Sequence, residues 1–392
     1  MPLPLYLLAM AVFAMGTSEF MLAGLLPDIA ADLGVTVGTA GTLTSAFALG
    51  MVIGAPLMAA LARNWPRRSS LLGFVLAFAT AHVVGALTTS FPVLFATRVV
   101  AALANAGFLA VALTAAAALV PSTYKGRALA VLLSGTTVAT VVGVPGGSVL
   151  GTLLGWRSAF WAVAVLCLPA TVGILKGIPA GRVHTEATGQ PRLRAEFAQL
   201  TRPPLMLVLV LGALVNAATF GGFTFLAPVV TGTAGLGAWW IPVALVLFGT
   251  GSFAGVTVAG RLSDQRPGQV VAVCGPLLLI GWPTLAALAH EPIVLLPLVF
   301  ALGALSFALG STLITRVLYE AADAPTMAGS YATTALNIGA VVGPLLAATT
   351  LSTGAGRVGP LWASGLLIAI TLLIALPLRP VLTPDRNTEV LP

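Results

Sequence analysis

Two charged residues stand inside long apolar stretches of the sequence. Of the 11 acidic residues only Glu19 lies in such a stretch, and of the 18 basic residues only Arg98 does. A charge near the centre of a bilayer costs at least about 2.5–3.5 kcal/mol, so charged residues there are usually functional. A carboxyl group can bind and release a proton, and a neighbouring guanidinium acts on its charged form. The pair therefore indicates a proton-binding site within the membrane.

The depths of these two residues agree. Glu19 lies eight residues before Pro27, where the first apolar run ends, or about 12 Å from that end at the rise of an α-helix. Arg98 lies about six residues into the fourth run, or about 9 Å from the same side. We predict a Glu19–Arg98 pair or a shared polar network that couples protons to a conformational change. A structural ion pair is the alternative. His82 is the one histidine in these runs and is expected to be a hydrogen-bonded helix residue rather than a proton relay.

The elements that position these residues follow from the composition. The chain has 392 residues, of which 58% are hydrophobic and only 7% charged, whereas soluble domains carry about 25% charged residues. A soluble protein is therefore excluded. A membrane-spanning helix needs about 20 apolar residues, and twelve such runs are present. They cover residues 3–26, 40–62, 70–88, 92–117, 128–152, 158–177, 205–230, 239–260, 269–289, 293–315, 327–350 and 360–379.

The basic residues indicate the orientation of these spans. Fifteen of the 18 lysines and arginines fall in loops on the side of the N-terminus, and only Arg157 and Arg357 fall on the other side. Because cytoplasmic loops of membrane proteins are enriched in lysine and arginine, both termini and the long polar stretch are predicted to be cytoplasmic. The net charge of +7 is explained by this topology, so no nucleic-acid partner is expected.

The two halves of the chain resemble each other at an offset near 200 residues. Pro27 and Pro228 close corresponding spans, and Arg157 and Arg357 occupy matching loops. We predict an all-α polytopic protein with two parallel six-helix repeats, a plan typical of secondary transporters that bind substrate between their halves. The predicted units are a bundle over residues 1–178, a cytoplasmic linker over 179–203 and a second bundle over 204–392.

Several further residues could form the cavity and its moving parts. Asparagines in a bilayer either join helices or line cavities, and phenylalanines could form one apolar wall. Glycines and prolines in spans five and eleven predict bent, closely packed helices where the halves can move. The cavity candidates are Asn105, Asn216, Phe220, Phe223 and Asn337, and the packing candidates are Gly143, Pro145, Gly146, Gly147, Gly343 and Pro344.

No set of residues in the sequence has the spacing of a catalytic, nucleotide-binding or metal site. The stretch from Gly354 to Gly359 fits the G-x-G-x-x-G pattern but follows a membrane span instead of a strand, and neither of the two lysines lies in a Walker A sequence. We therefore expect no enzyme activity, no cofactor and no metal.

Three motifs make the chain similar to the Major Facilitator Superfamily, in particular to its twelve-span drug:proton antiporters. They are the stretch from Gly16 to Ala30 around Glu19, the stretch from Leu94 to Arg98, and the glycine-rich stretch from Gly135 to Gly151. The resemblance implies that Glu19 takes part in proton coupling. The motif of span five implies an exporter rather than an importer.

The loop after span two departs from the pattern of that family, which usually reads Gly-x-Leu-x-Asp-x-x-Gly-Arg-Arg. Arg67 and Arg68 match it, but Arg63 replaces the aspartate. The corresponding loop after span eight keeps Asp264, which is the candidate for the remaining acid facing the basic loop.

Up to about residue 160 the sequence most resembles actinobacterial chloramphenicol-resistance exporters. This resemblance implies a bacterial inner-membrane protein, acting as a monomer, that exports chloramphenicol or a related amphenicol by proton antiport. The alternatives are an exporter of a sugar, a nucleoside or another drug, an importer, and a polytopic membrane enzyme or receptor.

Overall fold

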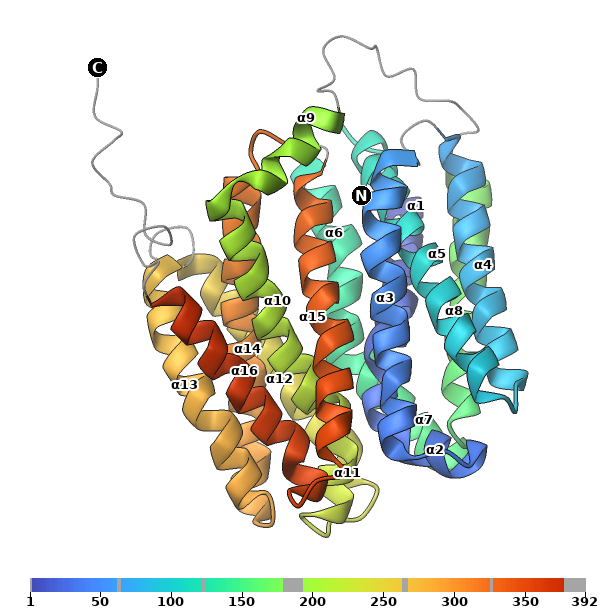
Figure 1. Ribbon diagram of the computed structural model, residues 1–392. Helices are drawn as coiled ribbons and strands as arrows, with labels where there is room; N and C mark the ends of the chain where they lie inside the picture. The colour runs from blue at the N-terminus through green and yellow to red at the C-terminus, as the bar shows by residue number, and fades with distance from the viewer. Residues whose placement is uncertain are drawn as a thin grey trace, which may run out of the picture.

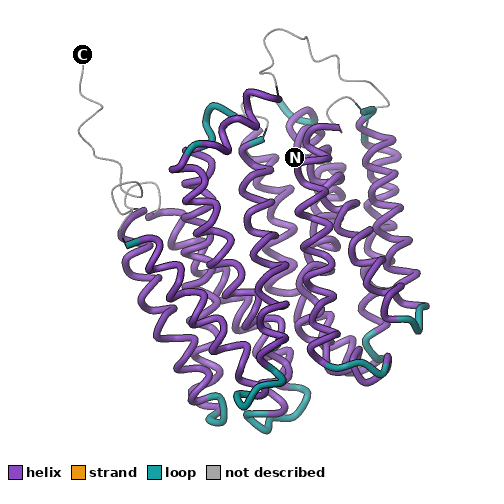
Figure 2. Tube along the Cα trace, viewed as in Figure 1, coloured by secondary structure: helices purple, strands orange, loops and turns teal. Residues whose placement is uncertain are grey.

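The computed structural model describes residues 2–61, 65–121, 125–178, 193–262, 267–324 and 327–376. These residues form helices and connecting turns, and the described ranges contain no strand (Figure 2). Twelve helical segments in them are long and apolar enough to cross a membrane. The expected all-α architecture with twelve spans is thereby confirmed.

In the described residues, most of the sixteen α-helices run roughly parallel to one another (Figure 1). The helices of the first half are α1 (Leu3–Phe20), α2 (Leu26–Leu33), α3 (Val37–Leu61), α4 (Arg67–Leu87), α5 (Phe91–Ala118), α6 (Lys125–Val138), α7 (Val144–Leu154) and α8 (Arg157–Gly177). Those that follow are α9 (Leu193–Ala198), α10 (Pro203–Thr224), α11 (Leu226–Gly232), α12 (Trp240–Leu262), α13 (Pro267–Leu288), α14 (Pro292–Glu320), α15 (Ala328–Thr350) and α16 (Gly359–Ala375).

The ends of these helices differ from the predicted runs by a few residues. The largest extension is in α14, which continues to Glu320, past the predicted end at residue 315. Arg316 donates a hydrogen bond to Glu320 at 2.9 Å within this last turn. Such a pair, four residues apart on one helix face, lets the helix continue beyond its apolar part.

The buried apolar side chains gather in two large clusters. One is built mainly by α1 to α8 and the other mainly by α10 to α16. The clusters meet where α3 packs along α15 and where α7 packs along α12. Ser45 of α3 donates a hydrogen bond across this boundary to the Val341 carbonyl at 2.9 Å. The two bundles therefore lie directly against each other without an intervening layer.

The first span is broken near its C-terminal end. Helix α1 ends at Phe20, a 3₁₀ turn follows over Met21–Gly24, and α2 begins at Leu26. Pro27 lies in the first turn of α2, where its missing N–H group leaves no helical hydrogen bond unmade. In the second half, α10 and α11 are likewise separated at Phe225. The break in the first span comes directly after Glu19.

Span five is irregular for a similar reason. A π-helical segment, Ala139–Gly143, separates α6 from α7, and Pro145 lies in the first turn of α7. Proline has no N–H group for the preceding turn, and a wider π turn is a common way to accommodate such a gap. In span eleven, by contrast, α15 passes through Pro344 without a change of helix type.

Two glycines of span eleven make close contacts with a neighbouring helix. A Cβ atom at Gly343 would come within 2.8 Å of the Ala217 carbonyl carbon in α10, and Gly339 is equally close to Ala213. A Cβ atom at Gly146 would meet nothing within 4 Å, and one at Gly147 would lie 3.4 Å from Met21. Close backbone approach therefore joins α15 to α10, whereas Gly146 and Gly147 of α7 leave space and Gly151 of the same helix packs tightly against Leu25.

These contacts predict that Gly343→Ala destabilises the protein, whereas Gly146→Ala does not. The alanine methyl group at residue 343 would collide with backbone atoms, which cannot rotate away, and such overpacking costs about 1–3 kcal/mol. The melting temperature of each purified variant in detergent measures the effect. Equal melting temperatures for the two variants would contradict the assignment of close packing to α15.

Candidate functional site

Arg98 is almost fully buried in the first bundle, with 1% of its surface exposed. Its Nη1 atom donates a hydrogen bond to the Ser18 hydroxyl at 2.7 Å, and its Nη2 atom donates to the Ser18 carbonyl at 2.8 Å. The Phe47 ring of α3 lies against the same guanidinium, with its centroid 4.6 Å from Cζ. Helices α1, α3 and α5 thus enclose one buried positive charge.

The end of α1 explains why the Ser18 carbonyl can accept this bond. The last carbonyl groups of an α-helix have no partner within the helix, and α1 ends two residues after Ser18. A buried guanidinium needs such acceptors. The break in the first span thereby provides one for Arg98.

Glu19 follows Ser18 but does not bind Arg98 directly. Among the described residues the Glu19 carboxylate has no hydrogen bond and no ion pair within 4 Å. The two charges still interact electrostatically over a longer distance. The direct partner of Arg98 is Ser18. Because Ser18 and Glu19 are neighbours on α1, this contact brings the guanidinium close to the Glu19 carboxylate.

His82 of α4 completes this polar cluster. Its Nε2 atom lies 2.7 Å from the Ser18 hydroxyl oxygen, and its Nδ1 atom lies 2.8 Å from the Phe78 carbonyl oxygen. Only 1% of the His82 surface is exposed. Both ring nitrogens are therefore hydrogen-bonded inside the bundle.

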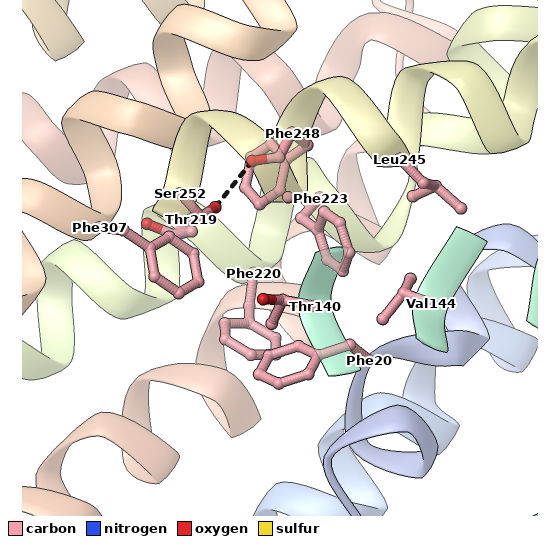
Figure 3. A pocket seen from close by; sticks show the side chains of 11 residues that line it. Phe20, Thr140, Val144, Thr219, Phe220, Phe223, Leu245, Phe248, Ser252 and Phe307 are labelled. Carbon is pink, nitrogen blue, oxygen red and sulfur yellow. Dashed lines mark hydrogen bonds between the residues drawn. The ribbon is translucent and has the colours of Figure 1, made fainter. Parts of the chain in front are cut away.

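An apolar cavity lies between the two bundles (Figure 3). Its volume is only about 10 Å³, because the surrounding side chains nearly fill it. Its lining consists of Phe20, Thr140, Val144, Thr219, Phe220, Phe223, Leu245, Phe248, Gly249, Ser252 and Phe307.

Aromatic rings from both bundles meet in this cavity. Phe20, the residue after Glu19, lies 5.7 Å from Phe220 and 6.5 Å from Phe223 between ring centroids. Phe223 lies 4.6 Å from Phe248. Figure 3 shows these rings turned toward one another with few polar groups among them. The lining is therefore chemically suited to an aromatic or apolar molecule, and it includes a residue that is joined directly to Glu19.

The predicted cavity residues divide into two groups. Phe220 and Phe223 line the cavity, but the three asparagines do not. Asn216 donates a hydrogen bond to the Leu336 carbonyl at 2.6 Å and so joins α10 to α15, whereas Asn337 donates to the Thr333 carbonyl of its own helix at 2.9 Å. Asn105 lies between α5 and α3, with its amide nitrogen 3.7 Å from the Met51 sulfur. Buried amides are stabilised by such partners, which draws these side chains away from the cavity.

Most of the cavity lining was not indicated by the sequence. Phe20 could have been found because it follows Glu19. Thr140, Thr219, Phe248 and Phe307 lie in spans of ordinary apolar composition, and nothing in the sequence alone distinguishes them.

The predicted gating residues that the structure describes lie at the start of one span and in the middle of another. Arg67 and Arg68 begin α4, and Gly143 ends the π-helical segment, where a Cβ atom would collide with Thr17 of α1. Arg63 and Asp264 lie outside the described residues.

A polar contact closes the other end of the first bundle. Arg157, at the start of α8, forms an ion pair with Asp32 of α2 and also donates a hydrogen bond to the Thr88 carbonyl at 3.1 Å. Trp156 donates to the same Asp32 carboxylate at 3.1 Å. Gly155 permits this turn because its φ of 83° favours glycine. The Gly155-Trp156-Arg157 sequence thus ties α8 to α2.

The twelve spans, arranged in two bundles around a central cavity, define a polytopic transport protein. A family model described as the Major Facilitator Superfamily matches residues 8–344, and the chain belongs to this family. It is 77% identical to the "Chloramphenicol resistance protein" of Streptomyces lividans over 98% of both chains. It is 31% identical to the "Inner membrane transport protein YdhP" of Escherichia coli strain K12 over 90% of both chains.

Two solved structures share the fold. The nucleoside transporter NupG aligns with a TM-score of 0.78 and 13% identity over 97% of this chain and 99% of its own. A bacterial homologue of the human lysosomal transporter Spinster, in an inward-facing and unoccupied conformation, aligns with a TM-score of 0.70 and 18% identity over 97% and 95% of the two chains. At these identities the likeness concerns the fold alone.

The contact between Asp32 and Arg157 predicts a pH-dependent contribution to stability. The hydrogen bond from Arg157 lowers the pKa of Asp32 below its ordinary value of 3.8. A carboxyl group with a lowered pKa stabilises the folded protein above its unfolded-state pKa, and this contribution disappears as the pH falls through the folded-state pKa. Asp32→Asn should therefore lower the melting temperature at pH 7, by an amount that corresponds to about 1 kcal/mol or less for this exposed pair.

The difference between the wild type and Asp32→Asn should shrink as the pH falls below about 3.8 and vanish only below the lower folded-state pKa of Asp32. Asp28→Asn, on the same helix, is the control for loss of a negative charge, because among the described residues Asp28 has no side-chain hydrogen bond or ion pair. A deficit of Asp32→Asn that stays constant with pH would argue against the ion pair.

Proposed function

We propose that the protein exports chloramphenicol or a related amphenicol from the cytoplasm in exchange for protons, and so confers resistance to the antibiotic. The observation that carries this proposal is the 77% identity to a protein named for chloramphenicol resistance, over 98% of both chains. Paralogous transporters with other substrates usually share much less sequence over their full length. The membership of both chains in one transporter family supports efflux as the means of resistance.

The chemistry of the cavity supports a small, uncharged aromatic substrate. Amphenicols carry one aromatic ring and neutral polar groups. Phe20, Phe220, Phe223 and Phe248 offer ring faces and edges for such a molecule, and aromatic pairs are favourable beyond simple burial. The hydroxyl groups of Thr140, Thr219 and Ser252 line the same space. Since binding sites for drug-sized molecules usually measure about 300–1,000 Å³, the halves must separate or the rings must turn before the substrate enters.

The charged cluster supports the coupling to protons. Glu19 is the acid that can exchange a proton inside the membrane, and Arg98 supplies a fixed positive charge close by. Coupling requires that the proton affinity of Glu19 differs between the two arrangements of the halves. Because Phe20 lines the cavity and is joined directly to Glu19, substrate that displaces Phe20 would also displace the carboxylate.

The two halves touch near one end of the spans. Gly24 lies so close to the second bundle that a Cβ atom there would come within 2.9 Å of Leu245, and one at Gly41 would come within 2.8 Å of Phe225. These contacts lie toward the end that carries α2 and α11 (Figure 1). With both termini in the cytoplasm of a bacterial cell, as the loop charges favour, this end faces outward. The proposed transporter is then a monomer in the inner membrane whose halves touch near its outer end.

The coupling assignment predicts that Glu19→Gln abolishes accumulation driven by a pH gradient. Glutamine is similar in shape but cannot exchange a proton, so drug could move only down its own gradient. In everted vesicles with an imposed pH gradient, chloramphenicol accumulation should fall by about tenfold or more, the effect expected when an interaction worth 1.4 kcal/mol or more is lost. Accumulation by Glu19→Gln at the wild-type rate would refute the role of Glu19. Glu291→Gln, an exposed acid before α14, is the control.

The substrate assignment predicts that Phe248→Ala lowers chloramphenicol tolerance, whereas Phe253→Ala does not. Both residues lie on α12, but Phe248 lines the cavity and Phe253 is 52% exposed on the outside of the bundle. Loss of a ring contact of about 0.5–1.5 kcal/mol should reduce the tolerated concentration severalfold in a sensitive host, at equal protein levels. A wild type that gives no tolerance would exclude chloramphenicol, and a growth panel with other drugs, sugars and nucleosides would then identify the substrate. Equal effects of both variants would place the site elsewhere.

A further inference from the structure

His82 is a buried ionisable residue that the proposed transport cycle does not use. It lies on α4, between the Phe78 ring at 4.3 Å and the Phe160 ring of α8 at 5.7 Å. Its polar neighbours are the Ser18 hydroxyl of α1 and, beyond this hydroxyl, the Arg98 guanidinium of α5. Glu19 is the nearby acid on α1. A histidine with this surrounding either carries protons itself or holds another group in place.

The hydrogen bonds fix which atoms carry the protons. The Phe78 carbonyl can only accept, so His82 Nδ1, at 2.8 Å, must donate to it. Arg98 can only donate, so the Ser18 hydroxyl oxygen accepts at 2.7 Å. The one hydrogen of this hydroxyl is then free to point at His82 Nε2, also at 2.7 Å. These three hydrogen bonds can all form together if Nε2 carries no proton.

A protonated imidazole would disturb this arrangement. Both His82 and Arg98 would then donate to the same hydroxyl oxygen, and two positive charges would share one small polar group. No acid among the described residues contacts the imidazole, and α8 presents only the Phe160 ring to it. In such a surrounding like charges repel strongly. The neutral imidazole with its proton on Nδ1 is the form that fits.

We propose that Ser18 and His82 are positioning residues that hold Arg98 in a fixed place beside Glu19, with His82 as the neutral Nδ1–H form. The order of donors runs from Arg98 to Ser18, from Ser18 to His82, and from His82 to the Phe78 carbonyl. This chain links α5, α1 and α4 at the point where α1 ends. His82 acts here as a hydrogen-bond acceptor and carries no proton to the substrate site.

Fixing Arg98 matters because the field of a charge at Glu19 depends on distance. A Ser18 hydroxyl that lacked its acceptor could turn toward another carbonyl and would no longer be oriented for Arg98. The guanidinium would keep its bond to the Ser18 carbonyl but lose the bond through Nη1. This role in transport rests on the proposed proton coupling at Glu19, whereas the proton position on His82 does not.

The proton position can be measured directly by ¹⁵N magnetic resonance of the protein in lipid nanodiscs. The chain has three histidines, so the double variant His184→Gln and His290→Gln leaves His82 as the one labelled imidazole. The expected spectrum shows a protonated Nδ1 and an unprotonated Nε2, unchanged from pH 8 to pH 6. Ser18→Ala should shift the Nε2 signal, because it removes the donor. A protonated Nε2, or a ring protonated on both nitrogens in this range, would overturn the proposal.

A matched pair of variants tests the role in transport. The side-chain amide of His82→Gln reaches the position of Nε2 and can accept from Ser18, whereas that of His82→Asn reaches only the position of Nδ1. We expect His82→Gln to keep most of the pH-driven drug accumulation and His82→Asn to lose about tenfold, the effect of a hydrogen bond to a charged network. Drug binding at equilibrium should stay unchanged in both, because neither touches the cavity.

Each outcome of this pair of variants decides whether His82 acts as a positioning residue. Equal loss in both variants would indicate that His82 itself exchanges protons, and equal retention would show that its acceptor is not needed. If either variant fails to fold, the magnetic resonance measurement on the folded protein still decides the proton position. If the wild type transports no chloramphenicol, the proposed function fails, but the spectrum still confirms or refutes the hydrogen-bond chain.

Discussion

The buried Arg98 guanidinium sets the constraint on which the centre of this protein depends. A positive charge inside a membrane protein needs acceptors that cannot come from water. Here the Ser18 hydroxyl and carbonyl supply two of them, and the carbonyl is free because α1 ends at Phe20. The break in the first span therefore provides a hydrogen-bond acceptor for Arg98 as well as a change of helix direction. It also places Glu19 and Phe20 at the same point, one facing the charge and the other lining the cavity.

The two halves of the repeat contribute different groups to the centre of the protein. The first bundle holds the intramembrane charges, whereas the cavity-lining rings on α10, α12 and α14 are contributed by the second. The halves meet through Phe20, which reaches from α1 toward Phe220 and Phe223. Packed interiors switch between discrete arrangements rather than deforming smoothly. A shift of Phe20 would therefore change the positions of both the charged cluster and the aromatic rings that line the cavity.

The sequence predicts the architecture well because the bilayer imposes it. Every span must satisfy its own backbone groups in a helix, so length and hydropathy are sufficient to find all twelve. The same patterns identify Glu19 and Arg98, since a charge stands out in an apolar run. They do not reveal that Arg98 binds Ser18, because the end of α1 at Phe20 leaves no mark in hydropathy. Nor do they reveal that Asn216 and Asn337 bond to carbonyl groups instead of lining the cavity, because this depends on which carbonyl lies within reach after folding.

Arg157 and Arg357 show which loop contacts the two halves of the repeat share and which contact occurs in one half alone. Arg157 and Arg357 both bind a carbonyl at the end of a helix, Thr88 after α4 in one half and Gly232 of α11 in the other. Such carbonyls favour a positive partner, which explains why each half keeps an arginine there. Only the first half adds a carboxylate, Asp32, which corresponds to Thr233 in the register of Pro27 and Pro228. In the second half the Arg357 side chain lies across the space that a side chain at the neighbouring Gly232 would fill. The shared feature is thus the closure of a helix end, and the ion pair is an addition that ties α8 to α2 in the bundle that also holds the membrane charges.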